Sequence, residues 1–122
     1  MFELKIITQF AAAHQLKMVS KKCENIHGHN WKIEVCVAGK NLNHAGVLKD
    51  FGEIKQHVSE IMTKLDHTFL NKLDFFRDIN PSSENIAFYV AQELEKVINS
   101  SVVQVSRVTA WESEDACATY IC

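Results

Sequence analysis

The order of the two hydrophobic periodicities along the chain limits its fold more than any other feature of the sequence. Apolar residues alternate in two segments, then recur with helical spacing in two, and two further strand-like segments follow. In chain order, these segments are residues 2–13, 29–39, 50–66, 81–99, 102–112 and 116–121. Strands and helices do not alternate, which disfavours a parallel doubly wound sheet. The pattern predicts an α+β fold in which an antiparallel four-stranded sheet carries two helices on one face.

Each predicted helix has a recognisable start and one apolar stripe. Asp50 with Glu53 forms a capping pair for the first helix, and Pro81-Ser82-Ser83-Glu84 begins the second, where the serines are most simply caps. The stripes consist of Phe51, Ile54, Val58, Ile61, Met62 and Leu65, and of Ile86, Val90, Leu94, Val97 and Ile98. Because the helices cover one sheet face, apolar residues on the other face and the outer edges stay open. We therefore expect oligomerisation through the sheet edges.

The composition excludes several classes of protein. The 122 residues contain four glycines, one proline and no linker or repeat, so residues 1–122 are expected to form one domain. Thirteen basic and fifteen acidic residues give a net charge of −2 without a basic block, which argues against a nucleic-acid partner. The apolar runs are too short to span a membrane, and the N-terminus lacks the layout of a signal peptide. We expect a cytoplasmic protein with four free cysteines.

Two histidines that flank a single glycine form the most distinctive local feature. His27 and His29 are two residues apart, so their side chains project to the same side of an extended segment. His14 ends the first predicted strand, which can pair antiparallel with the second and supply a third imidazole. Three imidazoles are a common catalytic zinc set that leaves one position open for substrate or water. From spacing alone, ordinary surface or structural histidines remain the alternative.

Three further features combine possible chemistry with a simpler explanation. Cys23 precedes the histidine pair, where a nearby metal would favour its thiolate, although free cysteine is usually a small buried hydrophobe. His67 follows Asp66, which could orient it and raise its basicity; the alternative is a cation at a helix end. Glu112 ends an apolar strand and could bind an amidine-like edge through two hydrogen bonds, although such carboxylates are more often surface charges.

Six segments of the chain, taken together, are far more specific than any one of them. They are Phe10-Ala11-Ala12-Ala13-His14, Cys23 through His29, Asp50-Phe51, Leu65-Asp66-His67-x-x-Leu70-Asn71, Pro81-Ser82-Ser83-Glu84-Asn85 and Glu112-Ser113. Their residues and their order resemble the 6-pyruvoyl-tetrahydropterin synthase family over essentially the whole chain. Ser82 and Ser113 stand where threonine is common, and neither change removes a hydroxyl group. The compact chain and the Ala-Ala-His form look most like the bacterial 6-carboxy-5,6,7,8-tetrahydropterin synthase branch, which serves queuosine biosynthesis.

The resemblance implies a fold, an assembly and a reaction. The fold is the tunnelling fold, in which three sheets close into a barrel and two trimers stack into a homohexamer with sites between subunits. The reaction is that of a zinc-dependent lyase, which converts 7,8-dihydroneopterin triphosphate to 6-carboxy-tetrahydropterin, acetaldehyde and triphosphate. The alternative in the family is 6-pyruvoyl-tetrahydropterin synthase, which only eliminates triphosphate. A folate-pathway branch typically has glutamate in place of Cys23, and the cysteine argues against it.

The resemblance also implies a role for each site residue. Zinc would acidify the side-chain hydroxyls of the substrate, Cys23 would remove a proton, and Asp66 would orient His67 as a proton shuttle. Glu112 would bind the guanidine-like edge of the pterin. The implied metal ligands are His14, His27 and His29, the catalytic residues are Cys23, Asp66, His67 and Glu112, and the substrate-binding residues are Glu112, Ser82, Ser83 and Glu84.

Some alternatives stay open at this level. Lys21, Lys22 and Lys32 are candidates for neutralising the triphosphate by their position alone. A cysteine hydrolase that uses Cys23 with the Asp66–His67 pair would need no metal. A zinc-stabilised binding module is a third class, and it would use Cys23 as the fourth ligand of a closed structural site.

Overall fold

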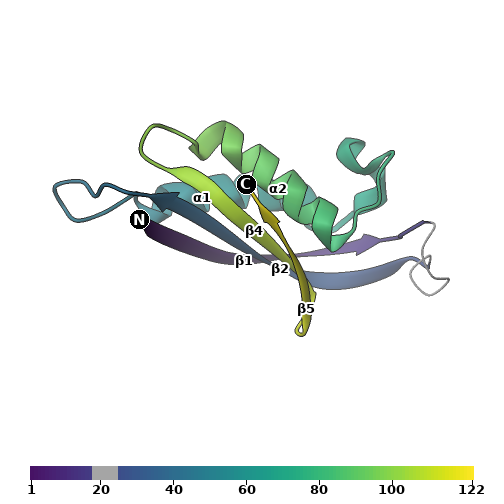
Figure 1. The fold of residues 1–122 in the computed structure, drawn as a ribbon. Coiled ribbons are helices and arrows are strands. Elements are labelled where there is room, and N and C mark those ends of the chain that lie inside the picture. The colour runs from purple at the N-terminus through teal and green to yellow at the C-terminus, as the bar shows by residue number, and fades with distance from the viewer. Residues whose placement is uncertain (18–24) are drawn as a thin grey trace.

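A five-stranded sheet carries both α-helices on one face (Figure 1). The computed structural model describes residues 1–17 and 25–122. The strands are β1 Phe2–His14, β2 His27–Gly39, β3 Thr68–Phe69, β4 Gln104–Ser113 and β5 Ala116–Ile121; the helices are α1 Phe51–Leu65 and α2 Ser83–Ile98, with 3₁₀ turns η1 Leu70–Lys72 and η2 Asp74–Phe76. The strand order is β3-β1-β2-β4-β5. The α+β prediction with two helices is confirmed, whereas the predicted strand count of four is wrong.

The additional strand, β3, is only two residues long. Thr68 and Phe69 run parallel to Ala12 and Ala13 of β1, while all other strand pairs are antiparallel. The chain reaches this position through His67, whose positive φ of 57° turns the backbone sharply after α1. Two residues carry no periodicity, so hydrophobic patterning could not have revealed this strand.

The two long strands β1 and β2 hold most of the sheet together. They pair over their whole length, from Phe2 opposite Gly39 to His14 opposite His27. One side chain in two faces the helices, and Phe10 and Trp31 are buried there with stacked rings. At the far end, a side chain at Gly39 would lie 2.5 Å from the carbonyl oxygen of Val102, so the close packing there requires glycine.

The helix caps form as predicted, and the stripes need two corrections. The Asp50 side chain accepts from the backbone of Glu53, and the Ser82 hydroxyl accepts from the backbone of the third residue of α2. The predicted stripe residues are buried except for Phe51 and Val97, which are 51% and 53% exposed. Phe51 is the first helical residue, outside the packed part of α1. Val97 lies about 100° around the helix from its neighbour Ile98, which takes the inward position.

The sheet face opposite the helices mixes ion pairs with apolar side chains. Arg107 pairs with Glu3 at 2.7 Å, and Lys5 lies 3.7 Å from Glu34. Ile7 on β1 and Ile121 on β5 are exposed. In the described part of the chain, no helix is long and apolar enough to cross a membrane. The cysteines that the structure describes, which are Cys36, Cys117 and Cys122, are free as predicted.

Candidate metal centre and active site

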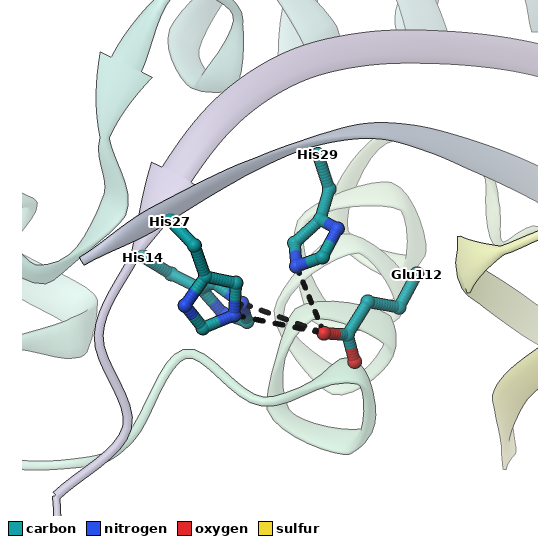
Figure 2. Close-up of side chains that lie close together, drawn as sticks. All are labelled: His14, His27, His29 and Glu112. Carbon is teal, nitrogen blue, oxygen red and sulfur yellow. Dashed lines mark hydrogen bonds and ion pairs between the residues drawn. The ribbon is translucent and has the colours of Figure 1, made fainter. Parts of the chain in front are cut away.

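Strand pairing brings the three predicted histidines together. In the β1–β2 register, His14 lies opposite His27, and Ala12 lies opposite His29. Side chains of these positions lie on the helix-covered face, because residues two apart in a strand point the same way. His14 is fully buried, while His27 and His29 are 31% and 24% exposed at the side chain. The imidazoles therefore surround one point at the edge of the core (Figure 2).

Backbone carbonyls determine which ring nitrogens are available. His14 Nδ1 lies 2.8 Å from the carbonyl oxygen of Pro81, and His27 Nδ1 lies 2.7 Å from that of Asn25. A carbonyl oxygen only accepts, so both Nδ1 atoms must donate, and in a neutral ring this leaves a lone pair on Nε2. The two Nε2 atoms lie 2.9 Å apart. Two lone pairs at this distance repel each other unless a cation lies between them, which is the arrangement of a metal-binding histidine pair.

Burial favours the neutral form of two of these rings, those of His14 and His29. Desolvation lowers the pKa of both His14 and His29 below the ordinary histidine value, and the nearby carboxylate of Glu112 only partly opposes this effect. Neutral imidazole is the form that binds a metal. His29 Nε2 is buried without an aligned hydrogen-bond partner among the described residues. Such an orphaned buried nitrogen fits a site in which a metal ion supplies the missing contact.

Glu112 completes the cluster from β4. Its Oε1 lies 2.9 Å from His29 Nε2, 3.7 Å from His14 Nε2 and 3.9 Å from His27 Nε2. The register of β4 with β5 shifts between Trp111 and Ser113, so Glu112 sits at a bulge, a feature that re-aims side chains. The four potential ligand atoms all lie within 4.8 Å of one another. Three imidazoles and a carboxylate are a donor set that suits zinc.

The N-terminus of α2 borders this cluster. The Ser83 hydroxyl donates to Glu112 Oε2 at 3.5 Å, while Ser82 caps the helix. Glu84 lies in the first turn and is exposed. Of the three predicted substrate-binding residues on this helix, Ser83 is therefore the one that the structure brings into contact with Glu112.

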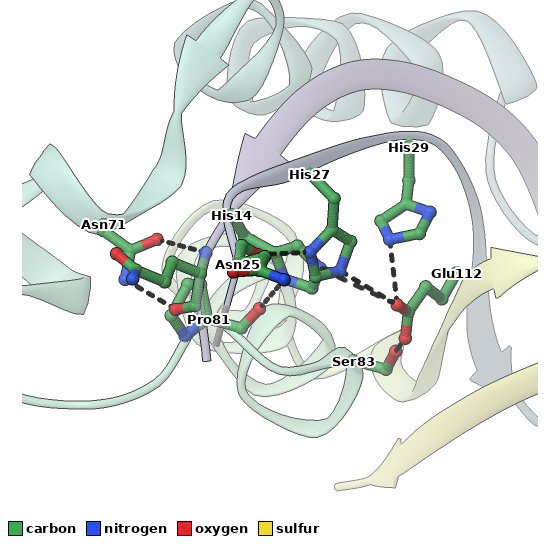
Figure 3. A network of polar contacts seen from close by, with 9 residues as sticks. His14, Asn25, His27, His29, Asn71, Pro81, Ser83 and Glu112 are labelled. Atoms are coloured by element: carbon green, nitrogen blue, oxygen red, sulfur yellow. Dashed lines mark hydrogen bonds and ion pairs between the residues drawn. The ribbon is translucent and has the colours of Figure 1, made fainter. Parts of the chain in front are cut away.

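Two asparagine side chains, Asn71 (Figure 3) and Asn80, which we call the asparagine clamp, hold the chain at the end of β1. Asn71 accepts from the backbone N–H of Gln15 and donates to its carbonyl oxygen, both at 2.8 Å. Asn80 pairs in the same way with Lys17, at 2.9 and 2.8 Å. Each amide thus imitates a neighbouring strand. The clamp joins η1 and the turn before α2 to the segment that carries His14.

A third asparagine ties this clamp to the helix. Asn85 Nδ2 donates to the carbonyl oxygen of Asn80 at 2.9 Å, next to the Pro81 carbonyl that orients His14. Asn71 and Asn85 belong to motifs that resemble the family, whereas nothing in the sequence singles out Asn80. Amide side chains in loops are too common for these contacts to be predicted from sequence.

Asp66 and His67 form a pair outside the histidine cluster. His67 Nδ1 lies 2.8 Å from Asp66 Oδ2, and Asp66 Oδ1 accepts from the backbone N–H of Ala11 at 2.8 Å. These hydrogen bonds lower the pKa of Asp66, the backbone contact more than the histidine. His67 is 83% exposed at the side chain, so its ring faces outward from this chain. The carboxylate orients the imidazole without bringing it to the four-residue cluster.

The remaining predicted positions are Cys23 and three lysines. Cys23, Lys21 and Lys22 lie outside the described residues. Lys32 sits over the Trp111 ring at 5.3 Å and lies 3.4 Å from Glu34. Strand alternation places it on the sheet face opposite the histidines.

Comparison with known proteins shows the family to which the chain belongs. The sequence profile described as 6-pyruvoyl tetrahydropterin synthase matches residues 3–121. The chain belongs to this family. Family members are lyases that act on pterins, so the chain is a pterin lyase by family.

Individual relatives carry different names within the 6-pyruvoyl tetrahydropterin synthase family. A protein of Archaeoglobus fulgidus, provisionally named 6-carboxy-5,6,7,8-tetrahydropterin synthase, is 41% identical over 90% of this chain and 87% of its own. Dihydroneopterin monophosphate aldolase of Pyrococcus furiosus is 34% identical over 87% of this chain and 85% of its own. The structure of Caenorhabditis elegans 6-pyruvoyl tetrahydropterin synthase superposes with a TM-score of 0.88 at 30% identity and covers 99% of this chain and 95% of that one.

Proposed function

We propose that this protein is a zinc-dependent 6-carboxy-5,6,7,8-tetrahydropterin synthase of queuosine and related 7-deazapurine biosynthesis. It would convert 7,8-dihydroneopterin triphosphate to 6-carboxy-tetrahydropterin, acetaldehyde and triphosphate. The observation that carries the proposal is the convergence of three Nε2 atoms and one Glu112 oxygen within 4.8 Å, beside the start of α2. The choice of this branch is supported by the relative of 41% identity, which bears the same activity in its name.

The pterin ring would bind between Glu112 and the first turn of α2. The amino group and ring N–H of a pterin form a row of two donors, which matches the two oxygens of one carboxylate. The Ser83 hydroxyl already contacts Glu112 Oε2 and would keep the carboxylate in plane with the ring. Ser82 and Glu84 flank this contact on the helix. The partly buried setting of Glu112, 34% exposed, would strengthen these hydrogen bonds.

Zinc bound by His14, His27 and His29 would supply Lewis-acid polarisation of the substrate's side-chain hydroxyls. Cys23, just before the metal ligands in sequence, would accept the proton from the activated carbon. His67, oriented by Asp66, would move protons on the opposite side of the substrate. Because His67 faces outward, it would serve the site of a neighbouring subunit in a cytoplasmic homohexamer of two stacked trimers.

The test is product analysis with purified protein. Incubation with 7,8-dihydroneopterin triphosphate, followed by mass spectrometry of the pterin and of the small volatile product, should yield 6-carboxy-tetrahydropterin and acetaldehyde. A pyruvoyl product without acetaldehyde would assign the protein to the alternative branch, 6-pyruvoyl-tetrahydropterin synthase. Full turnover after chelation would contradict the metal-dependent reaction and favour a cysteine hydrolase. A protein that binds zinc but turns over no pterin would be a binding module.

A further inference from the structure

Trp31 is a buried neighbour of the histidine cluster. It follows His29 by two residues on β2, so its side chain lies on the same sheet face as the histidines. The side chain is fully buried. The ring centroid of Trp31 lies 5.1 Å from that of His14 with an interplanar angle of 90°, and 5.4 Å from that of His29 with an angle of 75°. Both are edge-to-face contacts of the kind that aromatic rings prefer.

The three histidines differ in how their rings are held. The Nδ1 atoms of His14 and His27 lie 2.8 and 2.7 Å from backbone carbonyl oxygens. Within the described part of the chain, the Nδ1 of His29 has no such partner, and the polar contact of this ring is the one from Nε2 to Glu112 (Figure 3). A metal-binding histidine usually has a hydrogen-bond partner on its other nitrogen, which fixes the orientation of the ring. His29 therefore needs another source of orientation.

We propose that Trp31 is a positioning residue of the metal centre, whose indole holds the His29 ring with Nε2 facing the metal. The His29 side chain is 24% exposed, so one part of the ring borders solvent, while the buried part lies against the indole. Rotation about the Cβ–Cγ bond would turn Nε2 away from the point that it shares with the other two imidazoles. This inference rests on the proposed zinc-dependent function and names a residue on which the metal affinity depends.

Phe10 keeps the indole in place. The ring centroids of Phe10 and Trp31 lie 6.1 Å apart with an interplanar angle of 13°, so the two rings are nearly parallel, whereas both imidazoles are close to perpendicular to the indole. The indole Nε1 is buried without a hydrogen-bond partner among residues 1–17 and 25–122. Trp31 therefore acts on the histidines through its ring. A smaller side chain would leave space beside His29 and let the imidazole rotate.

The experiment separates metal affinity from stability. Zinc affinity is measured by chelator competition, and the free energy of unfolding by urea titration of the metal-free protein. Trp31→Leu should raise the dissociation constant for zinc about 10- to 100-fold, the range for losing a group that positions a metal ligand. Trp31→Phe keeps an aromatic ring and should raise it by a smaller, still measurable factor, which keeps the test decisive if the leucine variant does not fold.

Leu94→Ala is the matched control. Leu94 is fully buried on α2, about three turns from Ser83, so its truncation opens a cavity in the core away from the histidines. This variant should lower the free energy of unfolding and leave the dissociation constant for zinc unchanged. If the Trp31 variants behaved in the same way, Trp31 would have a structural role alone.

Co²⁺ in place of zinc gives a second, spectroscopic readout. Its visible absorption depends on its ligands and their geometry, so the spectrum should change in Trp31→Leu and stay as in the wild type in Leu94→Ala. The chain has two tryptophans, so Trp111→Phe leaves Trp31 as the only indole that fluoresces. In this variant, Co²⁺ bound beside the indole should quench the emission at one equivalent.

The two readouts distinguish failure of this inference from failure of the proposed function. Quenching of Trp31 by Co²⁺, together with wild-type zinc affinity and a wild-type Co²⁺ spectrum in both Trp31 variants, would overturn the positioning role and leave the proposed function standing. Emission that does not respond to Co²⁺ in Trp111→Phe would show that no metal binds beside the indole. That result would overturn the proposed zinc site and this inference together.

Discussion

His14 and His27 point their Nε2 atoms at each other across 2.9 Å, although each ring already donates its Nδ1 proton to a backbone carbonyl. In the neutral rings both facing nitrogens carry lone pairs, and a cation between them removes the repulsion. Neither strand alone could create this pair. It arises because the β1–β2 register ends with these two residues directly opposite each other.

Replacing one member of this pair should remove the metal. His27→Ala should bind no stoichiometric zinc and should lose activity, because the variant keeps only two of the three imidazoles that are proposed to hold the metal. Metal analysis of the purified variant and a thermal-shift assay with added zinc check this. Zinc should raise the Tm of the wild type and not that of the variant. The exposed His44→Ala is the matched control. Normal zinc content in His27→Ala would remove His27 from the ligand set.

The asparagine clamp should affect the metal from a distance. Asn80→Ala removes both hydrogen bonds to Lys17 and loosens the turn whose Pro81 carbonyl orients His14. We expect zinc affinity to fall about 10- to 100-fold, the range for losing a group that positions a metal ligand. Asn41→Ala, in an exposed loop away from this turn, is the control. If zinc affinity stays normal while only the free energy of unfolding falls, Asn80 has a structural role alone.

The clustering of the histidines could be predicted from sequence, because the spacing of two residues in a strand determines whether their side chains lie on the same face. The single residue between His27 and His29 places both side chains on one face of a strand, whatever the rest of the fold is. The contact of Glu112 with these rings depends instead on the β2–β4 register, in which Lys32 lies opposite Trp111. No local pattern encodes a register between segments so far apart in sequence. The role of Glu112 could therefore be proposed, but its contact with the histidines could not.

The clamp and β3 could not be predicted for related reasons. Asn71 and Asn80 form hydrogen bonds with backbone atoms of Gln15 and Lys17. Because every residue type offers these backbone atoms, the sequence does not show which residues are the partners. β3 has too few residues to show alternation. Val97 matched the helical period but lies outside the core, because the width of a buried stripe depends on the surface that covers it.

Cys23 should be needed for turnover and not for the metal. Cys23→Ala should keep normal zinc content, because the proposed ligands are the three histidines, while kcat should fall about 10²- to 10⁴-fold, the usual contribution of a general acid or base. Steady-state kinetics and metal analysis on the same preparation check both parts. Cys117→Ala removes an exposed thiol from β5 and should change neither quantity. Loss of zinc from Cys23→Ala would instead make the cysteine a ligand.

The Asp66 carboxylate should contribute to the free energy of unfolding at neutral pH, and this contribution should be lost in acid. The backbone N–H of Ala11 and the side chain of His67 lower the pKa of Asp66 below its ordinary value of 3.8. The Asp66 carboxylate therefore binds a proton more weakly in the folded state than in the unfolded chain. The stabilisation is complete above the unfolded pKa and is lost as the pH falls through the folded pKa.

Asp66→Asn tests this while keeping the shape of the side chain and an oxygen that can accept from Ala11. Urea unfolding between about pH 7 and about pH 3 should show the wild type more stable at neutral pH, with the difference shrinking in the acid part of the range. A difference that stays constant with pH would mean that the charge of Asp66 is not what stabilises the turn after α1.

The same variant should lower kcat, because the amide no longer holds the His67 ring, whose Nδ1 lies 2.8 Å from Asp66 Oδ2 in the wild type, in one orientation. Steady-state kinetics at a temperature where both proteins are folded check this, and an unchanged kcat would remove the Asp66–His67 pair from the reaction.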